Sequence, residues 1–350
     1  MPFIPNFDQA PYLVIWEATR ACDLSCRHCR ADAHAEPYPD ELTDSEARAL
    51  LTRLREGFGP ILLVLTGGDP LKRVGLDGLI RHGNELGLRM AITPAATPLL
   101  TRERLIQLRD AGIQRVALSL DGADAATHDG FRQVEGTFER TVRMLDVIKE
   151  VGLESQINTS VGRHNLHQVE AIAEIGRKAG ISLWSVFFLV PVGRAGRDAL
   201  ITAGEHEVAF RRLASIALDP ATAYMIKTTA GQPYYRVLAQ ERARRNAGAP
   251  LHSGRGVNDG NGFLFVSHVG DLQPSGFLAE RLGNIRQDDP IDLYRSHPTL
   301  KRLRQPETFA GKCGPCSFAR LCGGSRARTW ALTGDAFAED PTCVYEPPAV

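Results

Sequence analysis

Seven cysteines fall into two groups whose spacing suits metal binding. Cys22, Cys26 and Cys29 stand in the stretch ATRACDLSCRHCRAD with the spacing C-x3-C-x2-C, and the next cysteine is Cys313. Zinc sites normally need a fourth protein ligand, or water where the zinc is catalytic. A 4Fe–4S cluster also takes four ligands, so three cysteines would leave one iron free to bind a substrate or cofactor. The lack of a fourth cysteine nearby therefore points to an open metal site.

The second group of cysteines lies close to the C-terminus. It consists of Cys313, Cys316, Cys322 and Cys343, with the spacing C-x2-C-x5-C-x20-C. Four cysteines can saturate an iron–sulfur cluster, and four can equally close a structural zinc site. The spacing alone leaves both alternatives open.

The overall composition is that of an ordinary globular protein. The chain has 350 residues, of which 43% are hydrophobic and 23% charged, and Lys plus Arg equal Asp plus Glu at 41 each. This balance provides no global basic field for nucleic acid or an anionic membrane. The N-terminus lacks the features of a signal peptide, and apolar runs such as ILLVL at 61–65 are too short to span a bilayer. We therefore expect a cytoplasmic protein with no nucleic-acid or membrane partner, and without disulfides.

The elements that must position the first cysteine group alternate between apolar, β-branched runs and amphipathic stretches. The expected strands are 12–18, 61–66, 89–93, 115–120, 154–161 and 183–190. Strands that alternate with helices predict a parallel sheet with right-handed crossovers. Six units are too few for a closed eight-stranded barrel, so a doubly wound sheet or a partial barrel fits, and we adopt an α/β, partial (β/α)6 TIM-like barrel. The three cysteines follow the first strand directly, at the end where such folds place their chemistry.

The pattern changes after about residue 200. We divide the chain into a barrel at 1–205, a helical connector at 206–254 and a small α+β domain at 255–350. Within the last part, FLFVSHVGDLQPSGFL at 263–278 is typical of a β-hairpin.

The first cysteine group and two later motifs resemble the radical S-adenosylmethionine (SAM) superfamily. TGGDP at 66–70 and SLDG at 119–122 end the second and fourth expected strands, and His28 precedes the last cysteine of the group. In that superfamily the open iron of a 4Fe–4S cluster chelates the amino and carboxylate groups of SAM. Its reductive cleavage gives methionine and a 5′-deoxyadenosyl radical, which abstracts a hydrogen atom from the substrate. The resemblance therefore implies an enzyme whose cofactor does the hard chemistry while the protein positions it and excludes water.

The resemblance also assigns residues around SAM. Cys22, Cys26 and Cys29 would hold the cluster, and the backbone of TGGDP would bind the SAM amino group, because glycines let the main chain approach a ligand closely. The residues that would contact SAM are Gly67, Gly68, Asp69, Ser119, Asp121, Asn158 and Val190, with Asp69 in the place of the family's glutamate and Val190 against adenine. Arg132 and Arg140 are weaker candidates for its carboxylate.

The C-terminal cysteines resemble the SPASM or twitch-like extension of radical SAM enzymes, which holds auxiliary 4Fe–4S clusters. The full seven-cysteine pattern has three further cysteines. Two of them would stand where this chain has Ser275 and Arg326, and the third would precede them within 254–260, where the chain has no cysteine. The resemblance therefore implies a single auxiliary cluster and two 4Fe–4S clusters in all. The auxiliary cluster would be bound by Cys313, Cys316, Cys322 and Cys343.

Two strings narrow the resemblance to the branch of haem d1 biosynthesis and alternative haem synthesis. They are FLVPVGRAG at 188–196 and CGGSRARTWALTGDAFAEDPTC in the tail. Enzymes of that branch remodel propionate side chains of iron tetrapyrroles. A propionate needs cationic partners, and Arg194, Arg197 and Lys227 are the candidates. A reductant such as flavodoxin or ferredoxin would be a further partner.

Other functions stay open at this point. A SPASM-type maturase would modify a ribosomally made peptide, but only 21 residues precede Cys22, too few for the peptide-recognition domain that many such enzymes carry. Another small molecule is a further alternative. A non-enzymatic electron-transfer protein would need no SAM pocket, so TGGDP and SLDG count against it.

Overall fold

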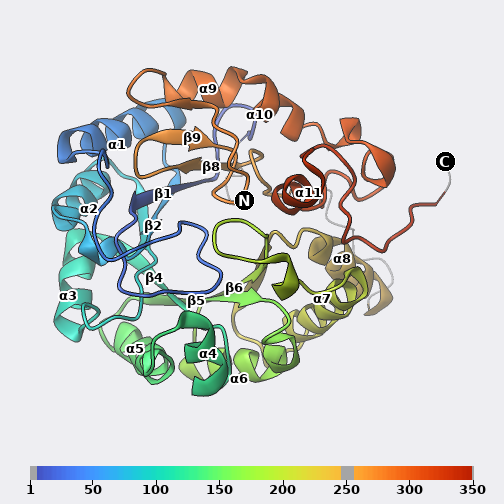
Figure 1. Cartoon of the computed structure of the whole chain (residues 1–350), viewed down its shortest axis with the longest axis horizontal. Helices are drawn as coiled ribbons and strands as arrows, with labels where there is room; N and C mark the ends of the chain where they lie inside the picture. Colours follow the sequence, from blue (N-terminus) through green and yellow to red (C-terminus); the bar gives the residue numbers. More distant parts are fainter. Residues whose placement is uncertain (1–5, 246–255, 349–350) are drawn as a thin grey trace.

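The computed structural model describes residues 6–245 and 256–348. Within these residues the strands form one curved sheet in the order β10-β9-β8-β1-β2-β3-β4-β5-β6-β7 (Figure 1). The strands are β1 Leu13–Thr19, β2 Leu62–Gly67, β3 Arg89–Ile92, β4 Ile113–Ser119, β5 Glu154–Val161, β6 Leu183–Phe188, β7 Met225–Thr229, β8 Phe263–Val266, β9 Asp271–Gln273 and β10 Gly283–Asn284. From β8 through β1 to β7 every neighbouring pair is parallel, whereas β9 and β10 are antiparallel additions.

Helices form an outer arc around this sheet in Figure 1. They are α1 Asp44–Phe58, α2 Leu76–Glu85, α3 Arg102–Ala111, α4 Ala125–Arg132, α5 Thr137–Glu150, α6 Val169–Ala179, α7 Ala203–Ala217, α8 Pro233–Arg245, α9 Pro290–Ser296, α10 Pro298–Leu303 and α11 Arg326–Thr333. Their ends carry the expected signals. Thr43 and Glu46 form a capping box at the start of α1, and Gly112 ends α3 in the left-handed conformation.

The two faces of the sheet differ in chemistry, and this difference creates the site. The face toward the helices is apolar and includes Trp16, Leu65 and Leu118, all fully buried. On β5, burial alternates strictly, so that Gln156, Asn158 and Ser160 lie on the opposite, inner face and stay partly exposed. The inner face of β5 is therefore polar.

The α/β sheet of parallel strands is confirmed, and the six expected strands are present with small shifts at their ends. The segment 206–254 was expected to be helical, and this is wrong for β7, which pairs in parallel with β6. Its sequence MIKTT carries a lysine and no apolar run, so the periodicity that marks buried strands is missing.

The expected β-hairpin is also present, as β8 and β9. It does not stand apart from the barrel, however, because β8 pairs in parallel with β1 and extends the same sheet. The sheet therefore continues across the predicted boundaries at residues 205 and 254. The division of the chain into three parts stays a prediction. None of the helices in the described part of the chain has the length and apolar character needed to cross a membrane.

Candidate functional site

One pocket brings the N-terminal cysteines together with most of the predicted SAM contacts. It lies at the C-terminal ends of the central strands and on the loop that follows β1. The predicted residues that line it are Cys22, Cys26, Cys29, Gly67, Gly68, Ser119, Asn158 and Val190. Ser119 and Asn158 are paired neighbours on β4 and β5, so their side chains lie level with each other on the inner face. Sequence reasoning thus found a site whose parts come from five separate segments.

The three thiols are surrounded by donors that suit a negatively charged sulfur. The backbone N–H of Leu24 donates to Cys22 Sγ at 3.4 Å, and that of Ala33 donates to Cys29 Sγ at 3.4 Å. Burial raises the pKa of the Cys22 thiol to about 12, so this thiol stays protonated until a metal displaces the proton. The N–H groups that face Cys22 and Cys29 therefore suit these two thiols as metal ligands.

The two glycines of TGGDP are required by the close approach of two backbones. The N–H of Gly68 donates to the carbonyl of Thr19 at 2.8 Å. A Cβ on Gly67, whose φ is +146°, would lie 2.0 Å from the Thr19 oxygen, and one on Gly68 would lie 2.4 Å from the Ala21 oxygen. This packing ties the end of β2 to the start of the cysteine loop and leaves main-chain groups at the pocket wall.

Asp69 does not line the pocket. Its carboxylate is fully buried and accepts hydrogen bonds from Thr97 Oγ1 at 3.0 Å and the Leu71 N–H at 3.1 Å. Burial raises the pKa of Asp69. The Asp69 side chain therefore fixes the loops around TGGDP and is not free to contact a ligand.

Asp121 also lies behind the pocket wall, where it holds Arg132. Arg132 Nε donates to Asp121 Oδ2 at 2.7 Å, and the N–H of Ser160 donates to Oδ1 at 2.6 Å. Burial alone would raise the pKa of Asp121, but the Arg132 guanidinium, two histidines and the Ser160 N–H together lower this pKa to about 2. Arg132 lines the pocket and directs Nη1 toward Cys26 Sγ at 3.6 Å. Asp121 thus orients an arginine that contacts Cys26.

The predicted substrate arginines do not reach the pocket. Arg194 donates through Nε to the Cys26 carbonyl at 2.9 Å and through Nη1 to the Ala33 carbonyl at 3.1 Å, so it braces the cysteine loop. Arg197 is exposed and donates to the Ala331 carbonyl at 3.4 Å. Lys227 lies on β7 level with Ser185. None of the three is among the described residues that line the pocket.

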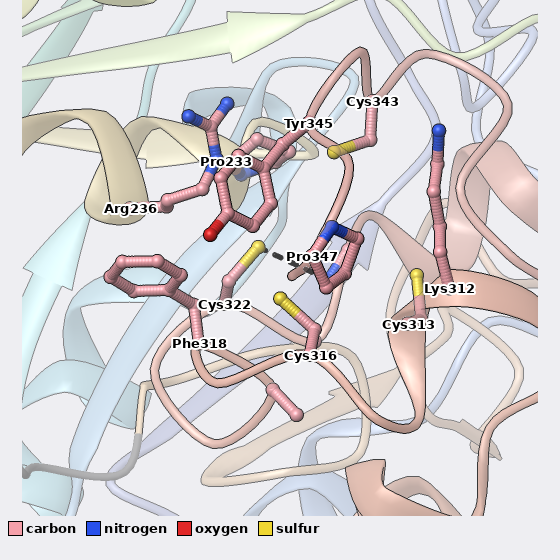
Figure 2. A pocket seen from close by; sticks show the side chains of 13 residues that line it. Pro233, Arg236, Lys312, Cys313, Cys316, Phe318, Cys322, Cys343, Tyr345 and Pro347 are labelled. Carbon is pink, nitrogen blue, oxygen red and sulfur yellow. Dashed lines mark hydrogen bonds between the residues drawn. The ribbon is translucent and has the colours of Figure 1, made fainter. Parts of the chain in front are cut away.

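The four C-terminal cysteines line a second pocket, with their sulfurs coming from separate turns of the tail (Figure 2). The Gly324 N–H donates to Cys322 Sγ at 3.3 Å and the Asp340 N–H to Cys313 Sγ at 3.4 Å. Burial raises the pKa of the Cys322 thiol. In the described residues no three His, Cys, Asp or Glu side chains are arranged to hold one metal ion. The donor set still suits a sulfur-ligated centre, because backbone N–H groups face the thiols.

Two of the three positions at which a full SPASM pattern would have a further cysteine are filled by the hydrogen-bonded polar residues Ser275 and Arg326. Arg326 is fully buried and donates through Nη1 to the carbonyls of Ala338 at 2.7 Å and Ala336 at 2.9 Å. Ser275 is buried and hydrogen-bonds to Asp259, which accepts the Ala327 N–H at 2.9 Å.

Comparison with known proteins agrees with this geometry. Residues 16–175 match the family described as the Radical SAM superfamily. Over 345 residues the chain is 40% identical to the AdoMet-dependent heme synthase of Oleidesulfovibrio alaskensis, which covers 96% of this chain and 87% of that protein. The chain belongs to the radical SAM superfamily. It is also 28% identical over 352 residues to the pre-heme d1 synthase of Dinoroseobacter shibae, covering 95% and 85% of the two chains, so the predicted haem-related branch is confirmed.

Solved structures support the fold of this radical SAM enzyme. Streptococcus suis SuiB bound to S-adenosylmethionine superimposes with a TM-score of 0.74, covering 96% of this chain and 78% of that one at 16% identity. SuiB bound to its precursor peptide SuiA gives a TM-score of 0.73 at the same identity and covers 96% and 76%. The likeness is one of fold, and it agrees with a partial TIM-like barrel.

Sequence reasoning missed residues that complete the wall of the pocket lined by the N-terminal cysteines. They include Arg30, Phe187 and Phe277. Arg30 directly follows Cys29, which is the one signal that could have singled it out. Its partner Glu17 lies on β1, and Phe277 comes from the loop after β9, so their meeting depends on the three-dimensional fold.

Proposed function

We propose that this enzyme cleaves SAM reductively and abstracts a hydrogen atom from a side chain of an iron tetrapyrrole, such as a propionate. The observation that carries the proposal is the 40% identity to an AdoMet-dependent heme synthase, which extends over 96% of the chain. The similarity includes the cysteine tail as well as the barrel. The pocket at the strand ends supports it, because three cysteines and a glycine-rich backbone share one cavity.

In this proposal the chain binds and orients the reacting groups. When bound, the cluster held by Cys22, Cys26 and Cys29 and the SAM beside it supply the 5′-deoxyadenosyl radical. Backbone groups of Gly67 and Gly68 would bind the SAM amino group. Ser119 and Asn158 would meet SAM from the inner face, and Val190 would pack on adenine.

We assign a second 4Fe–4S cluster to the C-terminal cysteines. Four thiols around one pocket and the N–H donors that face Cys313 and Cys322 support this assignment. The cluster would exchange an electron with the substrate side, and a one-electron protein such as flavodoxin or ferredoxin would supply reducing equivalents.

The test uses protein reconstituted without oxygen. Iron and sulfide are counted, and then dithionite and SAM are added with or without an iron tetrapyrrole that carries propionates. We expect about eight irons per chain. We also expect 5′-deoxyadenosine formation that the tetrapyrrole stimulates, with mass loss from the macrocycle. Slow SAM cleavage that no tetrapyrrole changes would contradict the substrate.

A peptide substrate is the second candidate. It draws support from the fold shared with SuiB, which has been solved with its precursor peptide. The higher identity to heme synthases over the full chain favours the tetrapyrrole. SAM cleavage stimulated by a peptide and not by any tetrapyrrole would reverse this order.

A further inference from the structure

Arg30 places a cation on the wall of the SAM pocket that the chemistry described so far does not use. It follows Cys29 directly, and its side chain keeps 18% of its surface exposed. Among the described residues that line the pocket none is Asp or Glu, whereas Arg30 and Arg132 are both present. Arg132 is balanced by Asp121 and directed toward Cys26. Arg30 is therefore the cation to examine for an anionic ligand.

The charge on Arg30 is only partly balanced by its own partner. Arg30 Nη2 contacts the carboxylate of Glu17, which is fully buried on β1. The same carboxylate also accepts Arg20 Nε at 2.8 Å and lies 2.8 Å from His268 Nδ1. Two guanidinium groups thus share the Glu17 carboxylate, so Arg30 has no carboxylate to itself within the described part of the chain. A second carboxylate would complete this arrangement.

The fold holds the Arg30 guanidinium in place before any ligand binds. Its Cζ lies 4.7 Å from the centre of the Phe265 ring on β8. A Cβ on Gly276 would lie 3.0 Å from Arg30 Nε and 2.9 Å from the Phe265 ring, so the bare backbone of the following loop packs against both. A side chain fixed in this way loses little further freedom on binding.

Two aromatic rings beside Arg30 suit a flat ligand. Phe187 is the penultimate residue of β6, and Phe277 belongs to the loop after β9. Their ring centres are 6.2 Å apart with the planes inclined by 55°. Both rings line the pocket and are only partly buried. An aromatic macrocycle could pack its face on such rings.

We propose that Arg30 binds a carboxylate of the substrate and that Phe187 and Phe277 contact the face of its aromatic ring system. The ligand class is a flat macrocycle with carboxylate side chains. This inference rests on the proposed function, since it gives the tetrapyrrole a place in the pocket. Arg30 takes the role that the sequence had suggested for Arg194 and Arg197.

The test compares two forms of one iron tetrapyrrole, the free propionate and its methyl ester. Binding to the reconstituted, SAM-bound enzyme is followed by the change in the absorption band of the macrocycle. We expect Arg30→Gln to weaken binding of the free acid by at least about tenfold and to leave the ester unchanged. Arg20→Gln is the matched control, because Arg20 shares Glu17 but does not line the pocket. It should keep the preference for the acid.

Each outcome decides between the claims. If wild-type protein binds neither form, the proposed function fails. If wild type prefers the acid and Arg30→Gln keeps that preference, the inference on Arg30 is wrong while the proposed function stands. Loss of SAM affinity in Arg30→Gln, with the acid preference intact, would also overturn it. Iron content checks that the variant still assembles, and Arg30→Lys, which keeps the charge but not the fork of donors, should restore part of the preference.

Discussion

In each of the two cysteine pockets, one arginine contacts one cysteine sulfur. Arg132 directs Nη1 to Cys26 Sγ at 3.6 Å, and Arg326 directs Nη2 to Cys313 Sγ at 3.7 Å. Arg326 is fully buried, and its Cζ lies 4.6 Å from the Phe309 ring centre. A positive charge and a hydrogen bond at a ligand sulfur favour the reduced form of a cluster, which carries one more negative charge.

Arg326→Gln should therefore lower the reduction potential of the auxiliary cluster. The substitution removes the charge while it keeps a side chain that can donate a hydrogen bond. A redox titration followed by electron paramagnetic resonance measures the potential. Arg326→Lys, which keeps the charge, should fall between the variant and wild type. An unchanged potential in Arg326→Gln, with the cluster present, would show that the arginine serves packing alone.

Substitutions in the two groups of cysteines should have different effects on iron content and on SAM cleavage. Cys26→Ala removes a ligand of the SAM site and should abolish SAM cleavage while the C-terminal iron remains. Cys316→Ala should lose roughly half of the iron and retain some SAM cleavage uncoupled from substrate. Iron analysis and 5′-deoxyadenosine assays check both. A tail variant that keeps all its iron and loses zinc instead would assign zinc to the second pocket.

At the scale of elements, the close packing of the ends of β1 and β2 positions the backbone of Gly67 and Gly68 at the pocket. Gly67→Ala would place a Cβ 2.0 Å from the Thr19 oxygen at a φ of +146°. The two backbones would have to separate, and we expect loss of SAM binding together with lower stability. Gly204→Ala, in α7, meets nothing within 4 Å and is the matched control. Equilibrium binding of SAM and chemical denaturation measure both effects, and unchanged SAM affinity in Gly67→Ala would contradict this account.

The elements also show which parts of the fold and of the site could be predicted from the sequence. Strands such as β5 were predicted because their burial pattern is local, and the cysteine loop was located because it follows a strand. The motif TGGDP was correctly placed at a strand end, yet the role of the Asp69 side chain depends on Thr97, which the sequence does not bring near. The pairing of β8 with β1 and the contact of Arg30 with Phe265 escaped prediction because they join segments far apart in the chain.

At the scale of the whole molecule, the tail is joined to the barrel by buried polar contacts. Arg328 on α11 is fully buried and donates through Nη1 to the Ala230 carbonyl, just after β7. The same side chain donates to Thr342 Oγ1 at 2.8 Å and lies 3.6 Å from Asp340 Oδ2. Asp340 in turn donates its N–H to Cys313 Sγ. One arginine thus links the barrel, α11 and the auxiliary pocket.

Arg328→Met should remove these contacts and first disturb the pocket lined by the four C-terminal cysteines. It removes the guanidinium that lies 3.6 Å from the buried Asp340 carboxylate, and a buried ion pair broken on one side costs about 3–5 kcal/mol. Because Asp340 also donates to Cys313, we expect loss of auxiliary iron before loss of the SAM cluster. Asp340→Asn in the same chain removes the unpaired charge and should recover much of the stability. Urea denaturation gives the unfolding free energy, and iron counts follow the cluster. Equal losses in the single and double variants would mean that Arg328 acts through its bonds to Ala230 and Thr342 rather than through the ion pair.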